Sequence, residues 1–426
     1  MRFLHLIQRY HPAVGGSEWY IKMLSEGLVQ QGHSVEVLTT TALEVDSLWR
    51  SDRAHVGACL PQAGEHAAPL HEEINGVKVH RIRPRYLPFH GKTMTLLSFL
   101  PGLSFKGRFA MPGPLLPGVK ELKKIVGPYD LVHASALPFT SLLWTALKLA
   151  SQAKAPLIYS PFMHLAIPDR LGYGYRKGYQ IELLKKADRV IVQTNIEREA
   201  LAKMGLSPQK MRLIGLGVDT DAHPGGGKRF RDRYGIKEPI VFNVSSRTYD
   251  KGAIHVVDAM KLLWEKGIVA RLVMAGPARD DYIAHVSKQP DKVRNHILDL
   301  GVVDEELKED AFSAADIFAM PSRSESFGIV YLESWNSGVP VIAARCGAPV
   351  EIIEDGRDGL LVDFGDVRAL AGAIERLLKD EGLRKKMGES GRRKVREKYR
   401  WSDKFAAYLK IIAELLPGIE KRYPDV

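Results

Sequence analysis

Residues 3–38 read FLHLIQRYHPAVGGSEWYIKMLSEGLVQQGHSVEVL, and the order of apolar and glycine positions in this stretch decides the fold. The apolar run 3–7 is typical of a short buried strand, and a loop with Gly15-Gly16 follows it. An amphipathic helix is expected over about 17–31, where a glycine ends it before a second strand at 35–38. Strand, helix and strand form a βαβ unit, which predicts a parallel sheet covered by helices.

The same alternation of short apolar runs and helices continues in two series. Further strands are expected at 77–82, 131–133, 157–159 and 190–193 in the first series, and at 240–244, 272–275, 297–300, 316–320, 339–343 and 360–362 in the second. Residues 219–239 between the two series contain His223-Pro-Gly-Gly-Gly-Lys228 and have no apolar periodicity. That pattern is typical of a connection between domains.

These patterns predict an α/β protein with two doubly wound, Rossmann-like domains. We expect them at 1–217 and 218–401, with a last helix within 402–426 packing back on the first domain. Two such sheets facing each other would place a ligand crevice at the carboxyl ends of their strands. A chain of 426 residues is too long for one hydrophobic core, which also favours two domains.

Composition narrows the class of protein. Hydrophobic residues make up 45% of the chain and charged residues 26%, which are globular values. No stretch approaches the roughly 18 apolar residues of a transmembrane helix, and the N-terminal apolar run is too short for a signal peptide. Cys59 and Cys346 have no motif around them, so we expect a soluble cytoplasmic protein with unpaired thiols. The net charge of +11 favours an anionic partner, but no nucleic-acid-binding motif accompanies it.

Two glutamates stand out in Pro321-Ser-Arg-Ser-Glu-Ser-Phe-Gly-Ile-Val-Tyr-Leu-Glu333. Glu325 is expected just ahead of a helix that starts near Phe327, and Glu333 lies two turns further along. The N–H groups of Phe327 and Gly328 would lack partners within the helix, whose end carries about half a positive charge. That suits a pyrophosphate or the polar face of a sugar. The alternative interpretation is a carboxylate that only faces the helix dipole and a second one that is solvated.

Two cations lie in Ser245-Ser-Arg-Thr-Tyr-Asp-Lys-Gly252, which also follows an expected strand. Arg247 and Lys251, beside a helix N-terminus, can neutralise a diphosphate leaving group without a metal ion. The alternative is a solvated surface pair. Asp280-Asp281 could be mistaken for a metal-binding pair, but it lies in a polar stretch expected to be a solvated loop. We therefore expect no required metal and no cofactor.

Together these segments resemble the retaining glycosyltransferases of the GT-B fold, glycosyltransferase family 4. The resemblance rests on the Glu-(seven residues)-Glu spacing, the Arg-x-x-x-Lys-Gly loop and Gly15-Gly-Ser-Glu18. Further matches are Leu300-Gly-Val-Val303, Gly338-Val-Pro-Val341, Gly347-Ala-Pro-Val-Glu351 and Asp358-Gly-Leu-Leu361. Each motif is weak alone, whereas the ordered set is specific. It runs over nearly the whole C-terminal half and at least residues 1–40.

The resemblance implies transfer of a hexosyl-type sugar from a UDP-, GDP- or ADP-sugar to an acceptor hydroxyl, with retention of anomeric configuration. Arg247 and Lys251 would bind the donor diphosphate, Glu333 the ribose hydroxyls and Glu325 the hydroxyls of the transferred sugar. The expected catalytic residues are Glu325, His164, Arg247 and Lys251. The expected donor-binding residues are Gly15, Gly16, Arg247, Lys251, Leu298, Leu300, Ser326, Phe327, Gly328 and Glu333.

Three of these assignments rest on position within the family pattern. The Gly15-Gly16 loop would approach the donor from the other domain, where a side chain would obstruct it. Residues 297–300 would bind the base through their backbone. His164 follows an expected strand where the family often has a sugar-contacting histidine, and the alternative is a structural histidine. The sequence departs from the pattern at Gly347-Ala348, where Gly-Gly is more usual, and residues 40–127 carry no recognised motif. The acceptor, whether a sugar, a lipid-linked or another hydroxyl compound, is therefore unassigned.

No side chain stands out as a nucleophile, so the leaving diphosphate itself is expected to accept the acceptor's proton in a front-face reaction. A rival function is a nucleotide-sugar 2-epimerase of the same fold, which would need acid/base groups that are not evident beside the glutamates. A non-catalytic nucleotide-sugar-binding protein would not need all four of Arg247, Lys251, Glu325 and Glu333. No Gly-x-Gly-x-x-Gly follows the first strand, which disfavours a dehydrogenase.

Residues 74–120 contain no Asp or Glu, while cations alternate there with aromatic and aliphatic side chains. The cations are Lys78, Arg81, Arg83, Arg85, Lys92, Lys106, Arg108 and Lys120. Such a segment suits the surface of an anionic bilayer, which predicts peripheral association with the inner face of the membrane. The alternative is that the apolar residues pack into the first domain and the cations face solvent or a soluble anionic acceptor.

Overall fold

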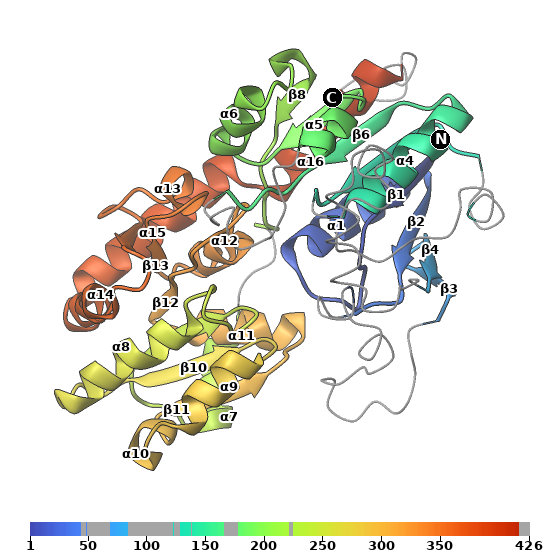
Figure 1. Cartoon of the computed structure of the whole chain (residues 1–426). Helices are drawn as coiled ribbons and strands as arrows, with labels where there is room; N and C mark the ends of the chain where they lie inside the picture. Colours follow the sequence, from blue (N-terminus) through green and yellow to red (C-terminus); the bar gives the residue numbers. More distant parts are fainter. Residues whose placement is uncertain are drawn as a thin grey trace. The chain divides into compact units, whose positions relative to one another are not determined.

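The computed structural model describes residues 1–43, 48, 69–83, 122, 128–137, 139–165, 178–220 and 225–416. The chain divides into two compact units (Figure 1). The first contains Met1–Met163, Pro168–Ile214 and Phe405–Val426, and the second contains His164–Ile167 and Gly215–Lys404. The main change of unit therefore lies at 214/215, where the sequence had suggested 217/218.

The first unit is built on an eight-stranded sheet. Its strands are β1 (Arg2–Leu6), β2 (Ser34–Thr40), β3 (His71–Ile74), β4 (Val77–Ile82), β5 (Leu131–Ser135), β6 (Leu157–Ser160), β7 (Arg189–Val192) and β8 (Met211–Leu213). Its helices are α1 (Gly16–Gln30), α4 (Thr140–Ala153), α5 (Gly178–Leu184) and α6 (Asn195–Lys203). The strand order is β3-β4-β2-β1-β5-β6-β7-β8, and only the β3–β4 pair is antiparallel among the described strands.

The second unit is built on a six-stranded, fully parallel sheet in the order β11-β10-β9-β12-β13-β14. The strands are β9 (Ile240–Val244), β10 (Arg271–Ala275), β11 (Ile297–Gly301), β12 (Ile317–Met320), β13 (Val341–Ala344) and β14 (Gly359–Val362). The helices are α7 (Gly227–Tyr234), α8 (Ala253–Glu265), α9 (Asp280–Ser287), α10 (Asp291–Arg294), α11 (Glu305–Ala314), α12 (Ile329–Asn336), α13 (Pro349–Ile352), α14 (Val367–Lys379) and α15 (Glu381–Lys398).

In both sheets, central strands are buried along their whole length. β5 and β9 are buried at every residue, as expected where helices cover both faces of a parallel sheet. In the second unit, side chains of α8 and α14 pack on strand residues such as Val241 and Ile342 to form one core. The prediction of an α/β protein with two Rossmann-like parallel sheets is confirmed.

The expected linker at 219–239 is wrong over part of its length, because α7 lies within it. Phe230 is the buried residue of this helix, so the segment lacks the apolar repeat that would have revealed it. The bend before α7 is formed by glycines because neighbouring chain leaves no room for side chains. A Cβ at Gly226 would overlap the Asp310 carboxylate, and one at Gly227 would overlap the Ser313 carbonyl.

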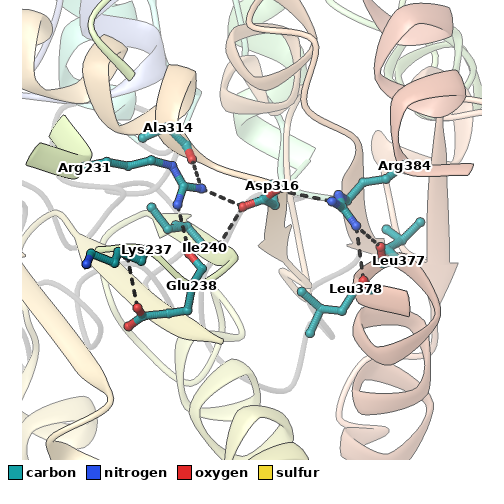
Figure 2. Close-up of polar contacts among 9 residues, drawn as sticks. All are labelled: Arg231, Lys237, Glu238, Ile240, Ala314, Asp316, Leu377, Leu378 and Arg384. Carbon is teal, nitrogen blue, oxygen red and sulfur yellow. Dashed lines mark hydrogen bonds and ion pairs between the residues drawn. The ribbon is translucent and has the colours of Figure 1, made fainter. Parts of the chain in front are cut away.

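A carboxylate shared by two arginines ties together the amino ends of strands in the second unit (Figure 2). Asp316 Oδ2 accepts hydrogen bonds from Arg231 Nη2 at 2.7 Å and from the Ile240 backbone N–H at 2.9 Å. Asp316 Oδ1 lies 3.4 Å from Arg384 Nη2. Arg384 Nη1 also donates to the carbonyl of Leu377 at 2.7 Å, in the last turn of α14. This network lies at the opposite end of the sheet from the carboxyl-end loops described below.

The last helix, α16 (Trp401–Leu415), begins in the second unit and continues in the first. Within the first unit, Tyr408 Oη lies 3.0 Å from His133 Nδ1, and His133 Nε2 lies 2.9 Å from Ser160 Oγ. His5 Nδ1 lies 2.7 Å from Ser25 Oγ. Burial lowers the pKa of His5 to about 3, and burial together with nearby His5 lowers the pKa of His133 well below its usual value. Both imidazoles are therefore neutral hydrogen-bonding groups inside the core.

The amino ends of the first sheet border a surface cavity of about 490 Å³, which Met1 and Leu416 both line. Tyr129, Asp130 and the segment from Ala153 to Pro156 complete its lining. The first and last described residues of the chain thus meet at one site on this unit.

Most of the cationic segment 74–120 lies outside the described residues, including Arg85, Lys92, Lys106, Arg108 and Lys120. Arg81 is described, and its expected place at a bilayer or solvent surface is wrong. It is 2% exposed, pairs with Glu72 and donates to the carbonyl of Pro69 at 3.0 Å. Within the described ranges, no helix is long and apolar enough to cross a bilayer.

Candidate functional site

Two loops at the carboxyl ends of neighbouring strands bring several of the predicted site residues together. The β9 loop, residues 245–252, leads from β9 into α8, and the β12 loop, residues 321–328, leads from β12 into α12. Since β9 and β12 are adjacent in the sheet, both loops leave it at the same edge.

Lys251 and Glu325 meet across these loops. Lys251 Nζ lies 2.5 Å from Glu325 Oε1, and their side chains are 27% and 10% exposed. The Lys251 backbone N–H donates to Thr248 Oγ1 at 3.1 Å, which holds the turn that carries the lysine. The structure thus joins the predicted diphosphate cation to the predicted sugar-binding carboxylate as an ion pair.

Arg247 is more enclosed than a solvated surface cation. It is 2% exposed, its Nε donates to the Gly276 carbonyl at 3.0 Å and its Nη1 lies 2.5 Å from Asp299 Oδ2. Its guanidinium carbon lies 4.9 Å from the centre of the Tyr282 ring. Asp299 is half-exposed, so the arginine faces the edge strand β11 through this carboxylate.

Glu333 lies on α12 with one carboxylate oxygen paired. Glu333 Oε1 is 3.0 Å from Lys308 Nζ, while the buried Glu333 Oε2 has no hydrogen-bond partner among the described residues. Burial of Lys308 disfavours its charged form, but the Glu333 and Glu305 carboxylates outweigh burial and raise the pKa of Lys308. The lysine is therefore charged, and an acceptor oxygen of Glu333 is left for a further donor.

The start of α12 differs from the prediction by two residues. The helix begins at Ile329, with Gly328 as its N-cap in the left-handed region at φ 93°. Phe327 therefore lies in the loop before the helix and not in its first turn. Its side chain is buried, and its ring centre lies 5.9 Å from that of Tyr399. Ser326 is partly exposed in the same loop.

His164 groups with the second unit and lies near the ion pair. Burial and the nearby Lys251 charge lower its pKa to about 4, although Glu325 and a hydrogen bond to the Ser324 backbone act in the opposite direction. A pKa this low keeps the imidazole neutral near pH 7. The structure therefore brings His164, Lys251 and Glu325 together.

Four other predicted residues lie at the start of α1 and on β11. Gly15 is the N-cap of α1 in the first unit, and a Cβ there would overlap the Glu18 carboxylate. Glu18 is buried and pairs with Arg9 at 2.7 Å, so a side chain at position 15 would displace this buried ion pair within the first unit. Gly16 is the first residue of α1. Leu298 and Leu300 lie on the edge strand β11, where the register shifts between Met274 and Ala275 of β10.

Sequence analysis missed the counter-charges of the site. Asp299 and Lys308 lie 52 and 25 positions from their partners, and no local pattern marks such pairs. The expected solvated loop at Asp280-Asp281 is wrong, since both residues form the first turn of α9. Asp281 Oδ2 accepts the Tyr249 backbone N–H at 2.7 Å, which anchors the β9 loop. In the part of the chain that the structure describes, no His, Cys, Asp and Glu side chains form a metal-binding cluster.

Comparisons with known proteins cover both units. The family model "Glycosyl transferase 4-like domain" matches residues 15–217, and "Glycosyl transferases group 1" matches residues 228–394. A D-inositol 3-phosphate glycosyltransferase of Acidothermus cellulolyticus is 32% identical over 325 residues, which cover 63% of this chain and 71% of that protein. An uncharacterized glycosyltransferase of Methanocaldococcus jannaschii is 26% identical over 424 residues, covering 95% of each chain.

Solved structures show the same fold over nearly the whole chain. Sucrose-phosphate synthase from Thermosynechococcus elongatus superposes with a TM-score of 0.73 at 22% identity, covering 97% of this chain and 98% of the other. Anabaena HepE in complex with UDP-glucose gives a TM-score of 0.73 at 18% identity, covering 97% and 100%. These likenesses confirm the GT-B fold predicted from the sequence. The Acidothermus relative and the family models on both units establish that this chain belongs to the glycosyl transferases group 1 family and is a glycosyltransferase.

Proposed function

We propose that the protein transfers a hexosyl-type sugar from a nucleotide-sugar donor to an acceptor hydroxyl, with retention of anomeric configuration and without a metal ion. The observation that carries the proposal is the group formed by Lys251, Glu325 and His164 at the carboxyl end of the second sheet. Glu333 lies further along α12, beside Lys308. Relatives support the donor class: HepE was solved with UDP-glucose, and a mannosyltransferase 32% identical over 214 residues is named as GDP-mannose-dependent.

In this proposal, the donor replaces ion pairs that the protein makes with itself. The Lys251 ammonium exchanges Glu325 for the donor diphosphate, and Glu325 then accepts hydrogen bonds from hydroxyls of the sugar. Arg247 acts beside Lys251 through the guanidinium that Asp299 and Tyr282 hold in place. Because each released charge gains a new partner, the exchange avoids leaving an isolated buried charge.

Glu333 receives the ribose. Its buried Oε2 lacks a partner among the described residues, and an unsatisfied buried acceptor is unfavourable until a donor reaches it. A ribose hydroxyl supplies that donor, while Lys308 keeps Oε1 and thereby fixes the carboxylate.

The reaction then needs positioning and charge stabilisation. The bond between the anomeric carbon and the donor phosphate oxygen breaks, and the acceptor oxygen bonds to the same face of that carbon. The proton of the acceptor hydroxyl passes to the leaving phosphate oxygen, whose negative charge Lys251 and Arg247 stabilise. His164, neutral because its pKa is about 4, makes a hydrogen bond to the sugar without adding a charge.

Donor screening tests the proposal. A panel of UDP-, GDP- and ADP-sugars is added to the protein, and a true donor at 100 times its dissociation constant should stabilise the fold by about 2.7 kcal/mol. With that donor, free nucleoside diphosphate should appear only when an acceptor is also present, and EDTA should not stop its release. Conversion of the donor into its 2-epimer without any acceptor would favour the epimerase, and donor binding with no chemistry would favour a binding protein.

Lys251→Ala should lower turnover by roughly a hundredfold to a thousandfold, or about 2.7–4 kcal/mol, with the fold retained. Steady-state kinetics with the identified donor measure the loss. Lys228→Ala is the control, since the Lys228 side chain is 93% exposed on α7. Arg247→Lys is preferable to Arg247→Ala, because truncation would strip Asp299 and the Gly276 carbonyl of a buried partner. Near-normal turnover of Lys251→Ala would remove the lysine from the mechanism.

A further inference from the structure

The β9 and β12 loops are joined by two ion pairs of opposite direction. Asp250 and Lys251 are consecutive in the β9 loop, and Arg323 and Glu325 lie in the β12 loop. Arg323 Nη2 lies 2.6 Å from Asp250 Oδ1, directly beside the 2.5 Å contact of Lys251 with Glu325. Each loop thus presents one cation and one anion, and each charge faces its opposite on the other loop.

Backbone contacts place the Asp250–Arg323 pair at the point where the loops are closest. The Arg323 N–H donates to the Asp250 carbonyl at 2.7 Å, and the Ser322 hydroxyl donates to the same carbonyl at 3.3 Å. Gly252 has φ 74°, and a Cβ there would overlap the Pro321 carbonyl. The loops therefore touch on both sides of the pair.

Arg323 also reaches a third loop. Its guanidinium carbon lies 5.6 Å from the centre of the Phe364 ring, in the segment after β14. Phe364 in turn packs edge-on against Tyr249 of the β9 loop, with ring centres 5.5 Å apart. The contacts of Arg323 thus extend to three of the loops at this edge of the sheet.

We propose that Asp250 and Arg323 are positioning residues that hold Lys251 and Glu325 at the spacing the donor requires. The inference deepens the function proposed above and rests on it for the roles of Lys251 and Glu325. When the donor separates Lys251 from Glu325, the Asp250–Arg323 pair stays intact and keeps both loops in place. The first pair exchanges partners during binding, whereas the second is permanent.

Because the Asp250–Arg323 pair is partly exposed, its effect on catalysis can be distinguished from an effect on folding stability. The side chains of Arg323 and Asp250 are 23% and 37% exposed, and ion pairs this open to water add little to folding stability. Loss of the pair should therefore appear in turnover, because small displacements of catalytic groups have large effects on rate.

The test compares Arg323→Gln, Asp250→Asn and the double variant. Both single variants should lower kcat by up to roughly a hundredfold, with melting temperatures close to the wild type. The double variant should be no worse than the poorer single one, because both changes remove the same contact. Arg271→Gln is the control: the Arg271–Glu238 pair, at 2.8 Å and 29% and 20% exposed, lies at the amino end of β10.

Direct binding of the anionic donor by Arg323 predicts a different pattern. Removing the Asp250 charge would then leave kcat unchanged or tighten donor binding, while removing the Arg323 charge would weaken it. Opposite effects of the two single variants, or losses that multiply in the double variant, would overturn the positioning role.

Labelling of lysines tests the geometry without any donor. Mass spectrometry after treatment with an amine-reactive reagent should show several-fold faster modification of Lys251 in Arg323→Gln and Asp250→Asn, and an unchanged rate in Arg271→Gln. Unchanged labelling of Lys251 in both variants overturns the inference even if transferase activity is found. Faster labelling in a protein that accepts no nucleotide sugar keeps the loop geometry and contradicts the proposed function.

Discussion

Glu325 and Glu333 carry the same charge in one segment, yet they have different partners in the structure. Glu325 is paired with Lys251 from the β9 loop, and Glu333 with Lys308 from α11. The sequence placed both glutamates near one helix end but could not supply these lysines. Charge partners 74 and 25 positions apart are brought together only by the order of strands and helices in the sheet.

Glu333→Gln should weaken binding of the free nucleoside diphosphate by about 1.5–3 kcal/mol, because a charge-assisted hydrogen bond to ribose is lost. Glu325→Gln should leave that affinity almost unchanged and reduce transfer, since the ligand group proposed to contact Glu325 is the sugar. Isothermal titration calorimetry measures both, with Glu389→Gln, an exposed position on α15, as the control. Equal affinity losses in the two variants would contradict the division of roles.

At the scale of elements, the pattern of apolar residues in the sequence predicted the positions of strands well and the first residues of helices less well. β4 and β9 agree with the expected ranges at both ends, because residues that commonly end strands flank them: Gly76 and Arg83 for β4, Pro239 and Ser245 for β9. β3 was missed, since its His-Glu-Glu-Ile sequence is only half-buried at the edge of the sheet. α12 begins two residues late because Gly328 takes a left-handed conformation, which the sequence does not reveal by itself.

Gly252→Ala should destabilise the second unit by more than the backbone strain alone. Position 252 has φ 74°, and its Cβ would overlap the Pro321 carbonyl. Gly267 is the matched control, with φ 78° and no atom within 4 Å of its Cβ position. The free energy of unfolding from denaturant titrations should fall by about 1 kcal/mol for Gly267→Ala and by more for Gly252→Ala. Equal losses would show that the two loops are not in close contact.

At the scale of the whole molecule, buried histidines predict a dependence of stability on pH. The folded-state pKa of His5 is about 3, whereas an unfolded histidine has a pKa of about 6.5. Below about pH 6.5, His5 is protonated in the unfolded chain but stays neutral in the folded protein. The free energy of unfolding therefore decreases as pH falls. Glu197 acts in the opposite sense, since burial raises its pKa to about 7. The free energy of unfolding should therefore be compared between pH 7 and pH 5 in wild type and in variants.

His5→Gln should remove about 2 kcal/mol of the pH-dependent loss between pH 7 and pH 5, because glutamine does not titrate. Urea titrations at the two pH values give the difference, whatever the absolute stability of the variant. His296→Gln, at an exposed position, serves as the control and should retain the wild-type difference. A variant with the same pH dependence as the wild type would rule out His5 as its source.

The predicted membrane association also concerns the whole molecule, and the burial of Arg81 changes how the prediction should be tested. Co-sedimentation with liposomes should require anionic lipid, weaken as salt rises and fall when Arg83 and Arg85 are replaced by Glu. Each lost cation costs about 1 kcal/mol near the surface, and charge reversal adds repulsion. Arg81 is left unchanged, since its loss would disturb the packing around Glu72 and Pro69. Equal binding to neutral and anionic vesicles would leave a soluble acceptor.

The path of α16 has a consequence for dissecting the chain by genetic means. A fragment ending at residue 214 would contain every strand of the first unit but would lack Tyr408, the partner of His133. Truncation there would leave His133 without this partner and would also remove the buried α16 side chains Leu409, Ile411 and Ile412. Met1 and Leu416 line one cavity, so a short glycine-rich tether joining 416 to 1 would let a circularly permuted chain begin at Phe405 and run through to Ile214. In such a permuted chain, the part of α16 that belongs to the first unit would come before β1 instead of after all the strands.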